Sequence, residues 1–278
     1  MDKIVIPLKI ILLIVFFSFY HTQLLISAEM WHPDKKRAPY PGEEYLNIQD
    51  GSILVWIPGG DFLMGSDNND MDEKPQHKVS IQGFWFGKFE ITNKQYLSYL
   101  KVNDETFPPY LDSQNMSNAM QPITAIKYNE AIKYVEWANL RLPTEAEWEY
   151  VASAGKHFLY ATSNGAKDKQ LANCWGKNGN DTWLEMTAPV GSFPENPYGI
   201  FDLACNVWEW TSSLYHSYPY SQRDGREDIE TKYQRVMRGG SWQFPIEYAR
   251  TTHRHHFAMH LRYDFVGIRV AKSSIPWK

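Results

Sequence analysis

The sequence is poor in cysteine, with only Cys174 and Cys205 among 278 residues. Two cysteines cannot supply the multi-disulfide framework of a small secreted scaffold. The sequence leaves open whether the two thiols pair with each other. The length suffices for one large domain with a sizeable core, or for two small domains.

Basic tracts, internal repeats and low-complexity segments are also missing. Lys and Arg number 28 against 32 Asp and Glu, and the net charge of -4 gives no electrostatic signal for nucleic acid. We therefore exclude nucleic acid as a partner. Aromatic residues, at 15%, are abundant instead. They suit irregular cores and ligand-binding clefts, carbohydrate-binding surfaces included.

An apolar run occurs near the N-terminus, but it has fewer residues than a membrane span needs. Lys3 gives it a positive start, Ile10–Phe19 is apolar, and Ser27 and Ala28 offer small residues for cleavage. His21–Gln23 interrupt the run before the roughly 20 residues that a span needs. We predict a cleaved signal peptide over residues 1–28 and an extracytoplasmic protein, periplasmic or secreted. The alternative is an uncleaved anchor, the only membrane association that we expect.

The remaining chain reads as a linker and one domain. Residues 29–50 are rich in proline and charge and predict an exposed linker, followed by a domain over residues 51–275. Ile53–Ile57 and Phe62–Met64 predict two short strands around a tight turn, and Val79–Phe89 predicts a further strand.

Three modest helices are expected between these strands and residue 155. Thr92 and Thr144 each begin a capping-box pattern. Asn129 is the expected cap of a helix between them, whose apolar face carries Ala131, Tyr134, Val135 and Ala138. Beyond Gly155 no long periodic segment occurs. Short strands, few helices and long irregular segments indicate a single α+β domain.

Six segments in order resemble the formylglycine-generating enzyme (sulfatase-modifying factor) family. They are Trp56–Gly65, Glu90–Tyr96, Arg141–Tyr150, Asn206–Trp210, Arg238–Trp242 and Gly267–Val270. The resemblance extends from about Ile53 to Ala271. It implies an irregular α+β domain of low secondary-structure content, distantly akin to C-type lectin domains.

The resemblance also implies calcium. One site would use the carboxylates of Asp202 and Glu209 with the carbonyls of Cys205 and Val207, because Ca²⁺ prefers several oxygen ligands. The family usually has glycine at the position of Cys205. A second site would use Asn173, the carbonyl of Cys174 and Asp181. The alternative is a turn whose carboxylates merely accept backbone N–H bonds.

The family's catalytic cysteines are absent. Active members place two thiolates after the Gly-Gly-Ser motif, where they bind copper(I). Here the corresponding residues are Phe244 and Ala249, which cannot ligate a metal or act as nucleophiles. The turn before Gly267 also departs from the family pattern. We therefore expect that the chain does not convert cysteine to formylglycine.

Two functions remain open for such a chain. The first is an oxidoreductase-like accessory factor that modifies an exported peptide or protein. The alternative is a non-catalytic, calcium-stabilised binding module for a peptide, a glycan or a partner protein. By resemblance, the cleft would be lined by Trp208, Ser241, Trp242 and Arg254.

A histidine-rich segment follows the expected cleft residues and offers ligands for copper or another transition metal. It contains His253, His255, His256 and His260. The first two would share a face of a strand, and the last two a face of a helix. One regular element cannot serve both pairs, so a loop would have to gather them. The alternative is a solvated surface loop whose arginines repel cations.

Overall fold

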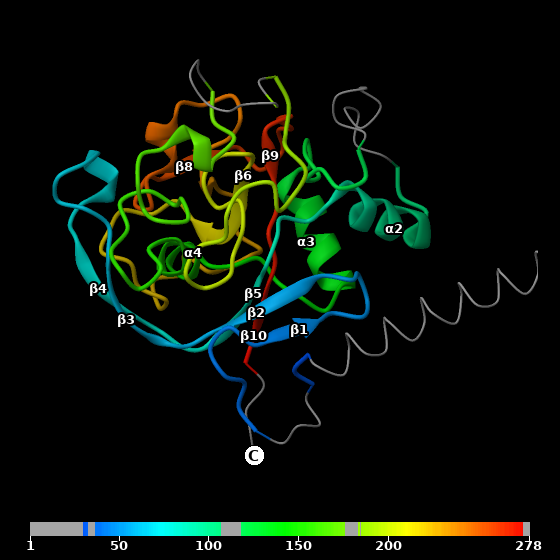
Figure 1. Cartoon of the computed structure of the whole chain (residues 1–278), viewed down its shortest axis with the longest axis horizontal. Helices are drawn as coiled ribbons and strands as arrows, with labels where there is room; N and C mark the ends of the chain where they lie inside the picture. The colour runs from blue at the N-terminus through cyan, green and yellow to red at the C-terminus, as the bar shows by residue number, and fades with distance from the viewer. Residues whose placement is uncertain (1–29, 33–36, 107–117, 176–182, 184, 275–278) are drawn as a thin grey trace, which may run out of the picture.

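The computed structural model describes residues 30–32, 37–106, 118–175, 183 and 185–274 (Figure 1). The predicted signal peptide and Asp181 lie outside these ranges. Within them the chain forms short strands in three sheets, three α-helices and long irregular connections, as the α+β expectation requires. None of the helices in the described part combines the length and apolar character needed to cross a membrane.

The first sheet joins the two ends of the domain. Its strands lie in the order β1 (Glu44–Leu46), β2 (Ile53–Ile57), β5 (Phe84–Gly87) and β10 (Ala271–Ser273), and every pairing is antiparallel. Part of the predicted linker therefore belongs to the domain, which corrects the expectation of an exposed segment over residues 29–50. Trp31 is buried and packs on Trp85, with ring centroids 5.1 Å apart.

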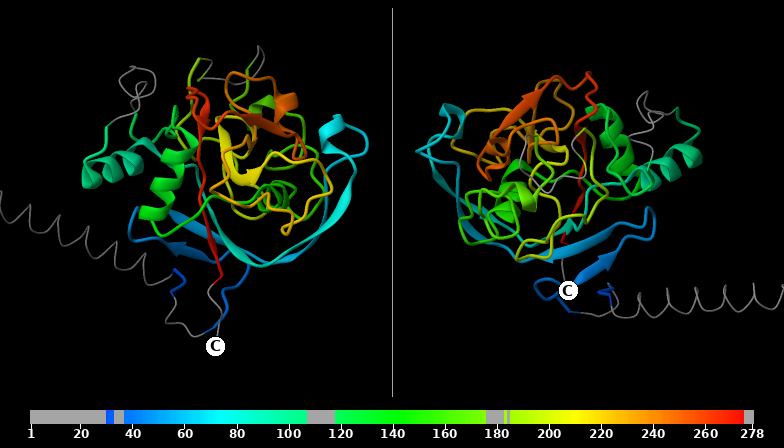
Figure 2. Two further views of the ribbon diagram at one scale, coloured as in Figure 1. Left: turned by 180° about the vertical axis from the view of Figure 1, so that it is seen from behind. Right: turned by 45° about the horizontal axis from the view of Figure 1, so that its top comes forward.

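The second sheet is a ribbon of β3 (Gly60–Met64) and β4 (His77–Ile81) that runs along one side of the molecule, opposite α2 (Figure 2). Both predicted strands around the tight turn form, but β2 and β3 enter different sheets. The predicted strand over Val79–Phe89 is interrupted after Ile81. Gly83 lies in the interruption and lets the Trp56 ring pack closely, because a Cβ there would come within 2.6 Å of that ring.

The third sheet contains residues from three of the six motif segments. Its order is β8 (His255–Phe257), β7 (Arg235–Arg238), β6 (Trp208–Leu214) and β9 (Val266–Gly267). The β6–β9 pair is parallel and the other pairs are antiparallel. The sheet thus places β9 beside the start of β6.

The helices are α2 (Asn93–Asn103), α3 (Tyr128–Trp137) and α4 (Glu145–Ala152), with short 3-10 turns η2 (Met71–Glu73), η3 (Lys169–Leu171) and η4 (Ile246–Ala249). The capping boxes at Thr92 and Thr144 are confirmed. The prediction that Asn129 caps α3 is wrong. The N-cap is Lys127, because its backbone N–H donates to Glu130 and so fixes the first turn two residues earlier.

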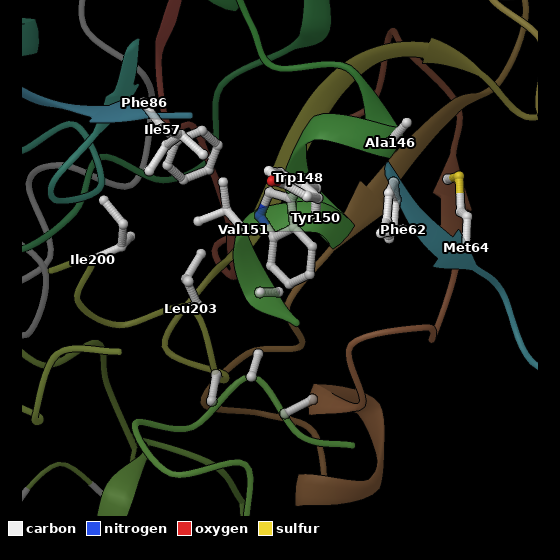
Figure 3. Packing of buried hydrophobic residues seen from close by; sticks show 14 of the residues in the cluster. Ile57, Phe62, Met64, Phe86, Ala146, Trp148, Tyr150, Val151, Ile200 and Leu203 are labelled. Carbon is white, nitrogen blue, oxygen red and sulfur yellow. The ribbon is translucent and has the colours of Figure 1, made fainter. Parts of the chain in front are cut away.

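Aromatic side chains fill the core, which explains their abundance. Trp148 and Tyr150 of α4 pack among Phe62, Ile57 and Val151 (Figure 3). A second cluster of buried residues gathers the rings of Trp31, Trp85, Tyr96, Tyr134, Trp208 and Trp210. The predicted apolar face of α3 is buried in this second cluster.

A buried ion-pair network fastens α4 to the third sheet. Arg238 of β7 donates to Glu145 over 2.9 Å and to Glu149 over 2.6 Å. Arg254 donates to Glu145 over 2.6 Å. All four side chains are fully buried or nearly so. Although burial opposes its charge, Arg254 and Arg238 hold the pKa of Glu145 below its usual range.

Replacing Arg238 by Met should lower the free energy of unfolding by about 3 to 5 kcal/mol, because removal of one partner leaves a buried charge uncompensated. Urea unfolding followed by circular dichroism measures this change. Lys133→Ala is the control, since it breaks a largely exposed pair with Glu105 and should hardly shift the urea midpoint. Similar midpoints for both variants would show that the network contributes little.

Candidate functional site

A half-buried group of rings lies over the third sheet, and we call it the Trp208 patch. It comprises Trp208, Phe244, Tyr248, His253, His255, Phe257, Tyr263 and Phe265. Trp208 is fully buried at its base, while the other seven are partly exposed. The centroid of Trp208 lies 5.0 Å from that of His255 and 5.7 Å from that of Phe244.

The patch occupies the place where the family resemblance expects the thiolate pair. Phe244 meets Trp208 edge to face and lies 5.1 Å from the ring of Tyr248, centroid to centroid. Ala249 is completely buried in η4. A ring and a methyl group thus stand at the two positions, and neither supplies the soft ligand that copper(I) needs.

The expected cleft residues divide into two groups. Trp208 belongs to the patch, and the half-buried Trp242 follows the fully buried Ser241. Both indole N–H groups are buried without a hydrogen-bond partner among the described residues. Arg254 does not face this region: its guanidinium donates to both carboxylate oxygens of Glu145 and to two backbone carbonyls. It is part of the ion-pair network.

The four histidines are not gathered at one point. His255 of β8 and His253, two residues before the strand, both contact the Trp208 ring, and their own ring centroids lie 6.5 Å apart. His256 instead lies against Tyr215, at 4.0 Å, and His260 is exposed in the turn that follows. Burial lowers the pKa of both His253 and His255 to about 4, so both imidazoles are neutral at pH 7.

One group of potential metal ligands does adjoin the patch. In the described part of the chain, Asp70, Glu73 and His253 are the group whose donor atoms all lie within 4.8 Å of one another. The guanidinium of Arg250 already lies 2.8 Å from Asp70 and 2.5 Å from Glu73. A metal ion would therefore compete with Arg250. Sequence reasoning missed both carboxylates because they lie about 180 residues from His253, in a polar loop.

The expected first calcium site lies at the turn that leads into β6 and packs against the connection between β5 and α2. Asp202 accepts N–H bonds from Gly191 and Phe193. Glu209 accepts bonds from Arg269, at 2.7 Å, and from the Trp148 indole, at 2.7 Å. Protein donors thus bind both carboxylates, but only Asp202 accepts the backbone N–H bonds that the alternative of a turn expects. Cys205 and Val207 are fully buried between them.

A third carboxylate at this turn was missed by sequence reasoning. Glu90 is buried, and its Oε2 accepts from Asn206 over 2.8 Å, while its Oε1 has no partner among the described residues. Burial, reinforced by Asp202, raises the pKa of Glu90 well above its usual range. Burial also raises the pKa of Asp202 to about 6. The sequence did point to Glu90, because this residue is the first of the Glu90–Tyr96 motif.

These groups together carry more negative than positive charge. Glu90, Asp202 and Glu209 face the single guanidinium of Arg269. Oxygen-rich, net negative surroundings with an unpaired carboxylate oxygen suit a hard cation such as Ca²⁺. The residues at this turn therefore fit the ion that the family resemblance implies.

The expected second calcium site is only partly described. The amide of Asn173 donates to Asn206, at 3.1 Å, and to the Met186 carbonyl. Asp181 lies outside the described residues. Cys174 and Cys205, whose pairing the sequence left open, form a disulfide with their Cα atoms 5.2 Å apart. The disulfide joins the loops of the two expected calcium sites.

Comparison with known proteins identifies relatives of this fold and sequence. Residues 46–274 match the family model described as the Sulfatase-modifying factor enzyme 1-like domain. The chain is 31% identical to a serine/threonine-protein kinase, pkn1, of Chlamydia caviae over 73% of its own length. It spans only 35% of that relative, about a third of the relative's length.

Two further relatives carry names that bear on catalysis. The formylglycine-generating enzyme of Mycobacterium tuberculosis is 29% identical over 62% of this chain and 76% of its own length. The inactive C-alpha-formylglycine-generating enzyme 2 of Mus musculus is also 29% identical, over 68% of this chain and 74% of its own length.

Solved structures agree with the sequence relatives. PvdO from Pseudomonas aeruginosa superimposes with a TM-score of 0.71 at 28% identity, over 85% of this chain and all of PvdO. Treponema denticola variable protein 1 gives a TM-score of 0.68 at 19% identity, over 84% of this chain and 99% of its own, and shows the fold alone.

Proposed function

The chain belongs to the Sulfatase-modifying factor enzyme 1-like family, and we propose that it is an extracytoplasmic accessory protein that binds an exported peptide or protein on the Trp208 patch. The observation that carries the proposal is the replacement of the expected thiolate pair by Phe244 and Ala249, which turns that position into an aromatic surface. A relative that is named inactive is consistent with loss of formylglycine generation in this family.

The chemistry of the patch suits a peptide. Its partly exposed rings offer apolar area and π faces to a ligand, and aromatic side chains of this kind suit a binding surface. The neutral imidazoles of His253 and His255 add hydrogen-bonding atoms without charge. The indole N–H of Trp208, at the base of the patch, is buried and has no hydrogen-bond partner among the described residues.

Two features support the extracytoplasmic location. The N-terminal sequence has the order of a signal peptide. The disulfide between Cys174 and Cys205 is typical of oxidising compartments.

The patch should bind the peptide acetyl-Phe-Gly-Phe-Gly-amide more tightly than acetyl-Ala-Gly-Ala-Gly-amide. Tyr248→Ala should weaken binding of the aromatic peptide about fivefold to tenfold, because a ring–ring contact contributes about 1 kcal/mol. Isothermal titration calorimetry measures both affinities. Tyr40→Ala, which removes an exposed ring far from the patch in the sequence, is the control. Equal affinity for the two peptides, or no effect of Tyr248→Ala, would refute peptide binding at the patch.

We also propose that calcium binds at the turn formed by Glu90, Asp202 and Glu209, with the carbonyls of Cys205 and Val207 as further ligands. The support is the buried, unpaired oxygen of Glu90 and the excess of negative charge. Bound to the folded state alone, Ca²⁺ would add stability by mass action.

Glu90→Gln should lower stability with calcium and change it little without calcium. With Ca²⁺ the melting temperature should fall, because a ligand is lost. In chelator it should stay nearly level, because burial raises the pKa of Glu90 and a neutral amide then replaces a protonated carboxyl. Glu105→Gln, at a largely exposed site, is the control. An equal loss under both conditions would make Glu90 a purely architectural residue.

The pH dependence in chelator follows from the raised pKa values of the wild type. A carboxyl whose folded pKa is raised stabilises the fold at low pH, and this stability is lost as pH rises through the folded pKa. The free energy of unfolding should therefore decrease from pH 4 to beyond pH 6, the value to which the pKa of Asp202 is raised. In Glu90→Gln the free energy of unfolding should decrease less over this pH range, because the titrating carboxyl of Glu90 is gone.

A second candidate function is an oxidoreductase-like accessory factor with a transition metal at Asp70, Glu73 and His253. It is favoured by the position of these ligands, since the His253 ring contacts both Tyr248 and Trp208 of the patch. This function requires Arg250 to move away from the two carboxylates.

Metal analysis of the purified chain tests this second function. If it holds, one copper or iron ion per chain should be present, lost in His253→Ala and retained in the control His260→Ala, whose imidazole is exposed and apart from the cluster. A parent protein without stoichiometric transition metal would leave peptide binding as the remaining function.

A further inference from the structure

A hollow of about 470 Å³ opens at the start of α3, next to the turn that follows β8. Its wall includes Lys127, Asn129, Lys232, Tyr233, Met259 and His260, and we call it the Lys127 hollow. The backbone N–H of Tyr128 donates to the carbonyl of Met259 over 3.2 Å, which holds the turn against the helix. Three separate stretches of chain thus meet at one concave surface.

Lys127 and Lys232, which line the Lys127 hollow, are both positively charged. Neither Lys127 nor Lys232 has an ion-pair partner in the described part of the chain, and no acidic residue lines the hollow. The nearby carboxylate of Glu130 is already bound by Arg262. In a chain of net charge -4, two lysines that line one hollow and have no ion-pair partner among the described residues make its surroundings locally positive.

The other groups of the hollow complement an anion as well. Helix α3 is ten residues long and directs the positive end of its dipole toward the hollow. The amide of Asn129, the hydroxyl of Tyr233 and the imidazole of His260 can donate hydrogen bonds. Met259 supplies an apolar wall, which suits an organic anion with a hydrocarbon stem such as a glutamate side chain.

The hollow and the Trp208 patch are continuous along the chain. Phe257 belongs to the patch, and the next three residues, Ala258 to His260, line the hollow. Three residues of extended chain reach at most about 10 Å. A single short peptide can therefore place an aromatic ring on the patch and a carboxylate in the hollow.

We infer that the Lys127 hollow binds a carboxylate of the exported peptide or protein, placed about three residues from an aromatic residue that rests on the Trp208 patch. This inference rests on the peptide-binding function proposed above and specifies its ligand. The carboxylate can belong to an acidic side chain or to the end of a peptide chain.

Three synthetic peptides test the inference by calorimetry at low salt. They are acetyl-Phe-Gly-Gly-Glu-amide, the uncharged acetyl-Phe-Gly-Gly-Gln-amide, and acetyl-Phe-Gly-Gly-Gln with a free carboxyl end. The Glu peptide should bind at least tenfold more tightly than the Gln amide, and the gain should shrink as salt is added. The third peptide shows whether a terminal carboxylate serves as well as a side chain.

Lys127→Ala combined with Lys232→Ala should abolish the tenfold difference. Lys101→Ala combined with Lys133→Ala is the matched control, because it removes the same charge from exposed positions on α2 and α3 outside the hollow. Lys232→Ala alone should reduce the difference in affinity between the Glu and Gln peptides. Because Lys232 lies in the loop before β7, this variant leaves Lys127, the N-cap of α3, unchanged. Melting temperatures confirm that each variant is folded.

The results separate the inference from the function on which it rests. Equal binding of the Glu and Gln peptides, or equal losses in the double variant and its control, overturns the Lys127 hollow while leaving the patch intact. Tight binding of the Glu peptide that depends on the two lysines but not on Tyr248 supports the hollow and refutes the patch.

Discussion

The structure depends on buried arginines that hold irregular segments together. Arg238 and Arg254 converge on Glu145 of α4, and Arg269 pairs with Glu209 beside the Trp148 indole. Guanidinium groups serve this role because each offers five donors in a fixed planar arrangement. In a fold with short strands and long loops, such groups satisfy backbone carbonyls that regular structure leaves unpaired, as Arg254 does for Asp72 and His216.

Contacts between neighbouring residues could be predicted from the sequence, whereas contacts between distant segments, such as those of the buried arginines, could not. The capping boxes at Thr92 and Thr144 were predictable because their hydrogen bonds span three residues. The pairing of β2 with β5 rather than β3 was not, because local pattern does not specify which strands become neighbours. At Asn129 two local signals competed, and the carboxylate of Glu130 decided where the helix begins.

The same distinction holds for the candidate site. The resemblance assigned Trp208 to the cleft and Phe244 to the position of a thiolate, and the two rings lie together in the Trp208 patch. It assigned Arg254 to the cleft, whereas the buried Glu145 binds its guanidinium. Glu90, Asp70 and Glu73 were missed because they approach the site from segments more than one hundred residues away. Such juxtapositions arise only when the three sheets assemble.

Loss of the thiolate pair need not disturb this scaffold, because Phe244 and Ala249 lie outside the ion-pair network. The network fixes β6, β7 and α4 independently of the side chains that cover the sheet at the patch. Substitutions at the patch therefore change its chemistry while the backbone that presents it stays in place. A soft-metal site can thus give way to an aromatic surface, and neighbouring charges such as Lys127 and Lys232 then determine which ligand that surface selects.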